Sequence, residues 1–542
     1  MLNRRQLLTP GGSLTAGALA AGCAPGTTEP GGSAGQPGAS TRPLTMPAFQ
    51  PYTGLKPDLP ALENGTSPYF AALPADPPTF TTGQPGSGGS IRCHTFLNSL
   101  PKPKPNQWWE KIESTLGAEL VLEGAPIGDY PAKFQTMVAG NDLADMVAIL
   151  PDQTPELSKL LEAKFADLTD HLSGDGIKDF PGLANIPSYC WDACIFGGRI
   201  RMLPIHRYAL RFVNVLIRAD VVERRGGPVA PKNGEEFHAL MKAVSNPAEK
   251  TFATNNVHSL LDRVAEMMEV PNEWAVEGGK FVKDVETPQY LEAIRFVRQC
   301  WEERLIHPDA FDPNFSLQTQ AMFNSGSIVL GYGSTWGNNA GQARDADPEA
   351  ISSWAPTMTW DGSRPVKHWL TSGAPYLTGI KQGDDARVRE LLGVANWFAS
   401  PWGTKEYLLF RYGIEGHDYT RDDNGTPVPT ADGKAENGAN GLIYMGASAL
   451  VHNYKHADIA EAEYRSEADG MENLAALPTV GLESATGQTK NAQLTKILQD
   501  GYGDIITGRK DVDSWSEVLA TWRAKGGDQV RHEYEESLQS RG

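Results

Sequence analysis

The chain is poor in cysteine, and beyond its first residues it has no long apolar segment. Cysteine accounts for five of the 542 residues. Lys and Arg together number 48 against 66 Asp and Glu, which gives a formal net charge of −18. A nucleic-acid-binding domain normally presents a basic face, and this chain has no extended Lys/Arg run. No later segment has the roughly 18 consecutive apolar residues that a membrane-spanning helix requires. We therefore exclude nucleic acid as a partner and expect no membrane-spanning helix.

Motifs that identify common enzymes and metal sites are also missing. The sequence contains no His-Glu-x-x-His and no Gly-x-Ser-x-Gly. Cys190 and Cys194 lack the spacing and the second Cys/His pair of a zinc site, so we expect no metal and no cofactor. In an exported protein these two cysteines could form a disulfide, and the sequence leaves this open. His452 and His456 have the i, i+4 spacing but no third ligand, and we expect both to be solvated.

The N-terminus has the pattern of an export signal. The pair Arg4-Arg5 precedes an apolar stretch, residues 7–22, that is too short and too weakly apolar to span a bilayer. The arginine pair favours the twin-arginine export route. Leu19-Ala20-Ala21-Gly22-Cys23 resembles a bacterial lipobox, whose cysteine is acylated and becomes the new N-terminus. We expect residues 1–22 to be a signal peptide and Cys23 to anchor the protein to the cell membrane, outside the cytoplasm. The alternative is a cleaved signal peptide whose cysteine has no role.

A tether is expected between this anchor and the folded part. Residues 23–89 are dominated by Gly, Pro, Ser and Thr. Such a composition buries too little apolar surface to offset the entropy of ordering. The middle of the segment, residues 52–80, carries scattered aromatic residues and could lie as an extended strap against the folded part.

Strands and helices alternate after the tether. Residues 90–96, 118–122 and 145–149 have the pattern of strands, and residues 108–116 and 130–140 that of helices. Strands separated by helices of this length indicate a parallel α/β sheet. Further strands are expected at 198–204, 209–218 and 327–332. Further helices are expected to begin at about Asp220 and to cover 233–244, 288–303, 388–398, 404–410, 491–501 and 514–538.

Six segments in the second part of the chain carry a family resemblance when they are taken in order. They are residues 216–222, 231–237, 274–281, 301–308, 324–327 and 412–419, which include Leu-Ile-Arg-Ala-Asp and Tyr-Gly-Ile-Glu-Gly-His-Asp-Tyr. Together, behind a lipobox, they resemble the extracellular solute-binding proteins of family 1, in the lipoprotein branch associated with oligosaccharide uptake by ABC transporters. The resemblance covers most of residues 90–542.

This resemblance implies an α/β, two-lobe periplasmic-binding-protein-like fold with a hinge and an inter-lobe cleft. Lobe 1 would comprise residues 90–205 and about 373–415, and lobe 2 about 206–372 and 416–542. The ligand sits in the cleft, and closure around it presents the closed form to the permease. The partners that the resemblance implies are a carbohydrate, in this branch an oligosaccharide, the ABC permease subunits and, through Cys23, the membrane. We expect a monomer without enzymatic activity.

Calcium is not expected, although some relatives carry a calcium loop before the helix that contains Glu235. Here residues 224–229 read Arg-Arg-Gly-Gly-Pro-Val, and two arginines stand where oxygen ligands would be needed. Residues 420–425 resemble the opening of an EF-hand, but Thr420 and Ala431 occupy its first and last ligand positions. We therefore predict a hairpin loop there.

Aromatic residues are the main signal for a sugar site. Sugars present apolar C–H faces and a rim of hydroxyls, so their sites combine flat aromatic rings with polar groups. Several of the 13 Trp and 16 Tyr lie in loop-like or strand-end contexts. In α/β folds ligands bind beyond the carboxyl ends of strands. The candidates are Trp108, Tyr189, Trp191, Arg207, Tyr208, Tyr332, Trp336 and Trp369. The alternative for each aromatic residue is packing in a core, and for Arg207 a surface ion pair.

Two other classes of function stay open. A secreted glycoside hydrolase needs two carboxylates at a set separation, which sequence spacing does not show. A binding protein of this type could also take a peptide or another polar solute. A scaffold or adhesion lipoprotein fits the alternating α/β pattern less well.

Overall fold

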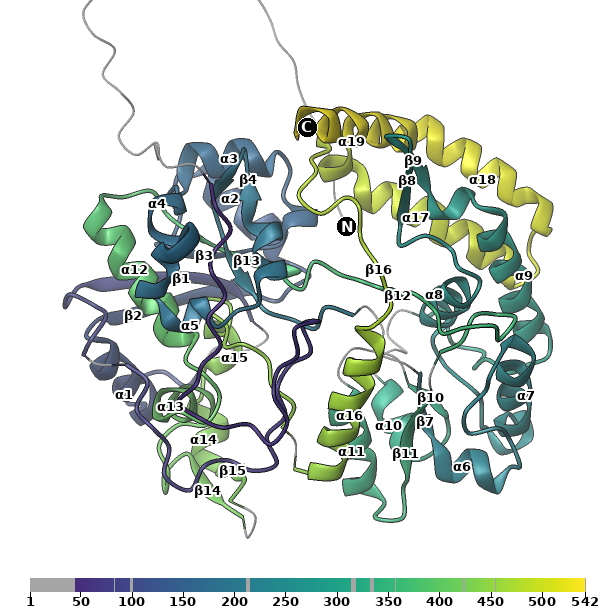
Figure 1. Cartoon of the computed structure of the whole chain (residues 1–542), viewed down its shortest axis with the longest axis horizontal. Coiled ribbons are helices and arrows are strands. Elements are labelled where there is room, and N and C mark those ends of the chain that lie inside the picture. Colours follow the sequence, from purple (N-terminus) through teal and green to yellow (C-terminus); the bar gives the residue numbers. More distant parts are fainter. Residues whose placement is uncertain are drawn as a thin grey trace, which may run out of the picture. The chain divides into compact units, whose positions relative to one another are not determined.

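The computed structural model describes residues 44–81, 83–97, 101–210, 215–312, 318–331, 336–355, 357–422, 425–453 and 455–541. Among these residues, no helix combines the length and apolar character that a membrane span requires. The two largest hydrophobic cores are built from alternating stretches of the chain (Figure 1).

The first stretch, which builds most of the first core, contains β1 (Ser90–Phe96), α1 (Gln107–Leu116), β2 (Glu119–Ala125), α2 (Tyr130–Ala139), β3 (Met146–Ile149), α3 (Leu157–Lys164), α4 (Thr169–Leu172), α5 (Pro181–Ala184), β4 (Ile195–Phe196), β5 (Arg199–Ile200) and β6 (Leu203–Ile205). Short 3-10 helices lie at Pro151–Gln153, Gly174–Asp179 and Ser188–Cys194.

The second stretch builds the second core. It contains β7 (Val215–Arg218), α6 (Ala219–Arg224), α7 (Gly234–Val244), α8 (Val257–Met267), β8 (Trp274–Glu277), β9 (Lys280–Lys283), α9 (Pro288–Glu302), α10 (Thr319–Asn324), β10 (Leu330–Gly331), α11 (Trp336–Ala346), β11 (Ser352–Ala355) and β12 (His368–Trp369). Short 3-10 helices lie at Pro247–Glu249 and Asp284–Glu286.

The chain then returns to each part once. The elements that follow β12 are β13 (Tyr376–Ile380), α12 (Asp385–Phe398), α13 (Lys405–Arg411), β14 (Tyr419–Arg421), β15 (Pro427–Pro429), α14 (Ala431–Glu436) and α15 (Ala439–Leu442). The last elements are α16 (Ala457–Gly470), β16 (Leu474–Ala475), α17 (Ala485–Ile506), a 3-10 helix at Val512–Ser514, α18 (Trp515–Trp522), a π-helical turn at Arg523–Gly527 and α19 (Asp528–Arg541).

A five-stranded sheet with the order β2-β1-β3-β13-β6 forms the centre of the first core. Strand β1 is parallel to β2 and β3, which confirms the expected parallel α/β arrangement. Strand β13 is antiparallel to both β3 and β6. The carboxyl ends of β1, β3 and β6 therefore meet the amino end of β13 at one edge of the sheet. All four residues of β3 are buried, as expected for a central strand covered on both faces.

Local sequence signals explain where the helices begin and end. Helix α1 begins after Asn106, whose side chain accepts a hydrogen bond from the Trp109 N–H, and it ends at Gly117 in the left-handed conformation. The C-terminal helix expected at 514–538 is interrupted instead, because Gly526 has a φ of 142° and separates α18 from α19. The predicted hairpin loop is confirmed, since β14 and β15 pair antiparallel.

The segment Leu216-Ile217-Arg218-Ala219-Asp220 forms a corner of the second core. Strand β7 is the middle strand of a three-stranded antiparallel sheet, between β10 and β11. Arg218 is buried, and its guanidinium pairs with the Asp220 carboxylate and donates to the carbonyls of Phe323 and Asn324 at the end of α10. The motif thus joins β7 to the last turn of α10, where helix carbonyls need donors.

Three segments cross between the two cores, at about residues 206–210, 370–375 and 446–453. The first core continues to Ala439, Leu442 and Met445, which lie on or just after α15. Residues 416–445 therefore pack with the first core, whereas the sequence analysis assigned them to lobe 2.

Residues 44–81 form a strap, which is drawn in purple in Figure 1. The Ala48 and Gln50 N–H groups donate to carbonyls of the first core, and the Pro60 carbonyl accepts from Tyr464 on α16. Tyr69 is 5% exposed and its hydroxyl donates to the Ala457 carbonyl. The strap expected over 52–80 is thus observed, and it extends back to Leu44, where backbone hydrogen bonds from Ala48 and Gln50 attach it to the first core.

Replacing Tyr69 by Ala is expected to lower the free energy of unfolding by about 3 kcal/mol, because a buried aromatic ring is lost. Tyr69→Phe, which loses only the hydrogen bond to Ala457, should cost about 1 kcal/mol. Urea unfolding measures both changes. Leu62→Ala is the control on the exposed part of the strap, with an expected change within about 0.5 kcal/mol. An unchanged stability of Tyr69→Ala would contradict the packing of the strap.

Candidate functional site

Arg207 and two tyrosines lie together at the edge of the first sheet where the carboxyl ends of its parallel strands meet. Arg207 follows β6, Tyr376 begins β13 and Tyr444 follows α15. The guanidinium carbon of Arg207 lies 5.5 Å from the centre of the Tyr376 ring and 5.8 Å from that of Tyr444. The ring of Phe96, the last residue of β1, packs beneath them, 5.2 Å from Tyr376 and 4.0 Å from Tyr444 between centres. We call Arg207, Tyr376 and Tyr444 the Arg207 cluster.

The Arg207 cluster offers a charged fork beside two aromatic rings. All three residues are half-buried, whereas Phe96 is buried. The guanidinium lies within the distance of a cation–π contact with both rings and donates one hydrogen bond, to the His206 carbonyl at 2.8 Å. Among the described residues, no carboxylate forms an ion pair with Arg207, so this part of the chain shows no surface ion pair for it. Burial raises the pKa of Tyr444, which keeps its hydroxyl protonated at neutral pH.

His206 and Tyr189 lie next to the Arg207 cluster and are joined by a contact between their side chains. The Nδ1 atom of the buried His206 accepts from the Leu450 N–H at 3.1 Å, which leaves the proton on Nε2, 3.1 Å from the Tyr189 hydroxyl. Burial lowers the pKa of His206 to about 3, and the nearby Arg207 adds to this effect. A neutral imidazole therefore joins the crossing segment 206–210 to the crossing segment 446–453.

Gly373 connects the third crossing segment, residues 370–375, to the segment 206–210. Its carbonyl accepts the Arg207 N–H at 2.8 Å, and its φ of +65° lies in the left-handed region that disfavours a side chain. A Cβ atom at this position would lie 2.3 Å from Cε2 of Tyr189. Only glycine allows the chain to pass so close to this ring.

Gly373→Ala is expected to lower the free energy of unfolding by about 2 kcal/mol or more, from backbone strain and the clash with Tyr189. Gly416→Ala is the matched control, because Gly416 has a φ of +85° but nothing within 4 Å of an added Cβ. Its free energy of unfolding should fall by about 1 kcal/mol, from backbone strain alone. Urea unfolding of both variants separates the two contributions, and equal losses would contradict the close contact.

Three of the predicted site residues lie in hydrophobic cores. Trp108 and Trp191 belong to the first core and Trp369 to the second, with exposures of 0%, 1% and 1%. The indole N–H groups of Trp108 and Trp369 donate to the carbonyls of Leu409 and Val270. Core packing, the alternative weighed for each, accounts for these three rings, and they present no face to a ligand in this conformation.

The remaining predicted residues have mixed positions. Tyr208 is 8% exposed, and its ring centre lies 5.8 Å from that of His452. Tyr332 and Cys23 lie outside the described residues. Trp336 begins α11, and its ring is outside the described part. The structure thus brings Tyr189, Arg207 and Tyr208 together near the crossing segments.

His452 is not solvated, which corrects the expectation from sequence. It is fully buried, with Nδ1 3.1 Å from Glu463 and Nε2 2.7 Å from Glu467, both on α16. Burial opposes the charge of the ring, but the hydrogen bonds to the two carboxylates outweigh it and raise the pKa of His452 to about 9. His452 is buried because the crossing segment 446–453 places it between the strap and α16. His456 is partly exposed and pairs with Asp345.

The four described cysteines are free thiols. Cys190 and Cys194 are both buried, and their S–H groups point to the carbonyls of Gly373 and Cys190. Of the two possibilities left open by the sequence, the structure has the thiols. Cys93 and Cys300 are buried as well.

Sequence reasoning missed Tyr376 and Tyr444. Tyr376 follows Gly373-Ala374-Pro375 at the start of a strand, a signal that a strand-end aromatic search could have found. Tyr444 follows the four-residue helix α15, and nothing in the sequence marks its approach to Phe96.

Two surface pockets lie away from the Arg207 cluster. One, of about 600 Å³, is lined by strap residues, α13 and β14, including Leu73, Lys405 and Tyr419. The other, of about 860 Å³, is lined by the start of the strap and residues of the C-terminal part, including Met46 and Glu483. Because neither contains the carboxyl ends of the parallel strands, we place the candidate site at the Arg207 cluster.

Comparison with known proteins gives relatives along most of the chain. Lipoprotein LipO of Bacillus subtilis is 21% identical over 481 residues, which cover 84% of this chain and 93% of LipO. The polygalacturonan/rhamnogalacturonan-binding protein YtcQ of the same organism is 20% identical over 81% of this chain and 89% of YtcQ. No family model matches the chain.

Solved structures share the fold over their whole length. The alginate-binding protein AlgQ2 without calcium ion is matched with a TM-score of 0.59 and 16% identity, over 86% of this chain and 100% of AlgQ2. An ABC-transporter-associated solute-binding protein from Bifidobacterium longum infantis is matched with a TM-score of 0.58 and 13% identity, over 83% of this chain and 98% of that protein. The chain therefore has the two-lobed fold of the extracellular solute-binding proteins of ABC transporters, the family that its motifs resemble.

Proposed function

We propose that this chain is the extracytoplasmic solute-binding subunit of an ABC importer, and that it binds an oligosaccharide at the Arg207 cluster and delivers it to the permease. The observation that carries this proposal is the half-buried group of Arg207, Tyr376 and Tyr444 at the ligand-binding edge of an α/β sheet, next to the segments that cross between the cores.

The chemistry of the cluster supports a sugar ligand. Tyrosine rings stack on the apolar faces of sugars, and the guanidinium fork donates to hydroxyl or carboxylate oxygens at the rim. The relatives agree with this chemistry, since YtcQ binds polygalacturonan and rhamnogalacturonan and AlgQ2 binds alginate. All three of those ligands are polysaccharides, and an arginine that has no carboxylate partner among the described residues suits an acidic one.

Binding at this position couples to hinge closure. The Leu450 N–H donates to Nδ1 of His206, and the Arg207 N–H donates to the Gly373 carbonyl, so two hydrogen bonds next to the cluster join the three crossing segments. A ligand that contacts Arg207 from one lobe and residues of the other lobe stabilises the closed form selectively. We propose Tyr332 and Trp336 as contacts from the second lobe, with Tyr189 and Tyr208 as positioning residues.

The anchor belongs to the same proposal. A lipid on Cys23 would hold the protein at the outer face of the membrane, with residues 24–43 between the lipid and the strap. Cys23→Ser is expected to move the protein from the membrane fraction to the soluble fraction of the producing cells, and Cys300→Ser, at a buried thiol, is the control that should stay with the membrane. Fractionation followed by immunoblotting measures this. A membrane-bound Cys23→Ser would contradict the anchor.

The first test of function is a thermal-shift screen of the chain from Ala24 onward against an oligosaccharide panel. This form keeps the strap, which is part of the fold. A ligand that binds only the folded state raises the melting temperature by mass action. A shift with one class of oligosaccharide, with the sugar recovered intact, supports the binding protein. A shift with cleavage would favour the glycoside hydrolase, and a shift only with peptides would favour a peptide-binding protein.

A further inference from the structure

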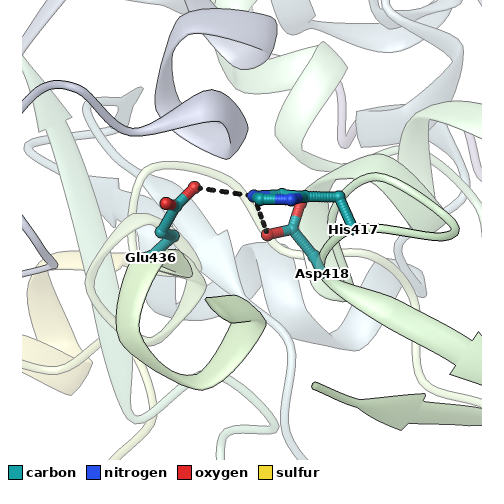
Figure 2. A group of neighbouring side chains, drawn as sticks. All are labelled: His417, Asp418 and Glu436. Carbon is teal, nitrogen blue, oxygen red and sulfur yellow. Dashed lines mark hydrogen bonds and ion pairs between the residues drawn. The ribbon is translucent and has the colours of Figure 1, made fainter. Parts of the chain in front are cut away.

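Three side chains with metal-ligand chemistry meet at a second place in the first core. His417 and Asp418 precede β14, and Glu436 is the last residue of α14 (Figure 2). The Nε2 atom of His417 lies 3.3 Å from Oε2 of Glu436 and 3.8 Å from Oδ1 of Asp418. One donor atom from each residue lies within 4.8 Å of the other two. Asp418 and Glu436 are 0% and 3% exposed.

One oxygen of this group has no partner. The Oδ2 atom of Asp418 accepts the Ile414 N–H at 2.6 Å, whereas Oδ1 is buried without a hydrogen bond. Oδ1 is the atom that faces His417, at a distance too long for a hydrogen bond. A buried carboxylate oxygen without a hydrogen bond is costly, so a cation bound by both Asp418 and His417 would offset this cost.

A proton does not satisfy the group as well as a metal ion would. A proton on Nε2 of His417 can be donated to Glu436 or to Asp418, but not to both. The two carboxylates carry two negative charges, and Lys102, 3.1 Å from Glu436, supplies one positive charge. Four-coordinate zinc, with bonds of about 2.0–2.2 Å, places its ligand atoms about 3.3–3.6 Å apart. The distances of 3.3 and 3.8 Å from His417 are close to this spacing.

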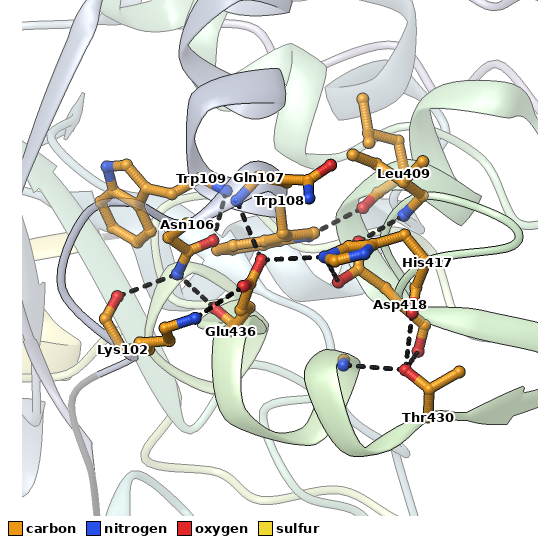
Figure 3. Close-up of polar contacts among 12 residues, drawn as sticks. Lys102, Asn106, Gln107, Trp108, Trp109, Leu409, His417, Asp418, Thr430 and Glu436 are labelled. Carbon is orange, nitrogen blue, oxygen red and sulfur yellow. Dashed lines mark hydrogen bonds and ion pairs between the residues drawn. The ribbon is translucent and has the colours of Figure 1, made fainter.

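The surroundings hold the three side chains in place (Figure 3). Oε2 of Glu436 also accepts the Gln107 N–H at the start of α1, and the Glu436 carbonyl accepts from the Asn106 side chain. The Thr430 hydroxyl lies within hydrogen-bond distance of the carbonyls of His417 and Asp418. Ligands that are themselves hydrogen-bonded are typical of built metal sites. The His417 side chain is 24% exposed, which gives an ion a path from solvent and a place for a water ligand.

We propose that His417, Asp418 and Glu436 bind a divalent transition-metal ion, with zinc as the ion that the set fits best. Imidazole nitrogen favours zinc over calcium or magnesium, and three protein ligands leave a fourth position for water. The ion would tie the turn 413–419 to α14 and, through Glu436, to the start of α1. No metal is expected from the sequence, and an adjacent His-Asp pair with a glutamate 18 residues later matches no common metal-binding motif.

The test is zinc titration of the metal-free, untagged chain from Ala24 onward, by calorimetry and by thermal unfolding. We expect one zinc ion per chain and a higher melting temperature with zinc. His417→Gln and Asp418→Asn should each weaken binding at least about tenfold. Asp418→Asn keeps an acceptor for the Ile414 N–H and removes the unpaired charge. Without metal it should therefore be at least as stable as the native chain, which separates loss of the site from misfolding.

His532→Gln is the matched control, because His532 forms an exposed i, i+4 pair with Glu536 at 3.1 Å. Its zinc affinity should equal that of the native chain. Zinc binding that is unchanged in His417→Gln and Asp418→Asn, or a native chain that takes up no zinc, would overturn the proposal. Calcium that binds more tightly than zinc would overturn the assignment of the ion. Oligosaccharide binding is measured separately, so failure of this site leaves the proposed function untouched.

Discussion

Arg207→Ala is expected to weaken oligosaccharide binding by roughly ten- to a hundredfold, because hydrogen bonds to a charged group contribute about 1.5–3 kcal/mol. Tyr376→Ala and Tyr444→Ala each remove a ring from the same cluster and should weaken binding by about tenfold or more. Isothermal titration with the sugar found in the thermal-shift screen gives these affinities. Arg207→Lys keeps the charge but loses the planar fork, so its affinity should fall between those of Arg207→Ala and the native chain.

Arg389 provides the control for Arg207. Its guanidinium carbon lies 5.7 Å from the centre of the Phe180 ring, so it makes a similar cation–π contact without belonging to the Arg207 cluster. Arg389→Ala should leave the affinity for the sugar unchanged. If Arg207→Ala and Arg389→Ala bind the sugar equally well, Arg207 does not contact the ligand and the site lies elsewhere.

The stability of the chain is expected to fall between pH 6.5 and 8.5 because of His452. Its folded pKa of about 9 is above the ordinary value of 6.5, since Glu463 and Glu467 hold the ring charged despite its burial. A group with a raised folded pKa contributes stability fully below its unfolded pKa, and this is lost as the pH rises toward 9. The expected loss over this window is about 2 to 3 kcal/mol.

Other buried titratable groups change the stability of the chain at pH values outside 6.5–8.5. Burial lowers the pKa of His94 to about 4 and that of His206 to about 3, so their contribution is lost as the pH falls below 6.5. Burial raises the pKa of the Cys93 thiol to about 12, so its contribution is lost only above the ordinary thiol value of about 9. Stability should therefore be highest near pH 6.5.

Urea unfolding at pH 6.5, 7.5 and 8.5 tests this with His452→Gln. The free energy of unfolding of this variant should be roughly 3–5 kcal/mol below that of the native chain at pH 6.5, because two buried carboxylates no longer have their partner. Its stability should then stay about constant from pH 6.5 to 8.5. His456→Gln removes the partly exposed partner of Asp345 and should change stability by less than about 1 kcal/mol. A native chain whose stability is constant across the window would contradict a charged His452.

Local patterns were sufficient to predict strands β1, β2 and β3 of the first sheet and several of the helices. Strand β1 has the expected bounds, and α7 begins after Asn233, whose side chain caps it, as the polar-to-apolar change at this point indicates. Alternation and helical periodicity are properties of neighbouring residues, so sequence carries them directly. The pairing of β13 with β3 and β6 joins segments far apart in the chain, and only the fold shows it.

The candidate site was predicted in part. Arg207 and Tyr189 were selected because they lie where the first core ends, and the structure places them near each other through His206. Trp108 and Trp369 were selected for the same kind of context, but their rings turn into the cores. Sequence gives the residue type at a strand end and not the direction of its side chain. The burial of His452 depends on the strap, whose path across α16 has no local signal.

A crystal structure of the complex with the tightest-binding sugar shows whether the chain binds an intact oligosaccharide at the Arg207 cluster. We expect an uncleaved sugar ring stacked on Tyr376 or Tyr444, with a hydroxyl or carboxylate oxygen within hydrogen-bond distance of Arg207. A sugar bound in the pocket beside Leu73 and Tyr419, or a cleaved product in the crystal, would contradict it.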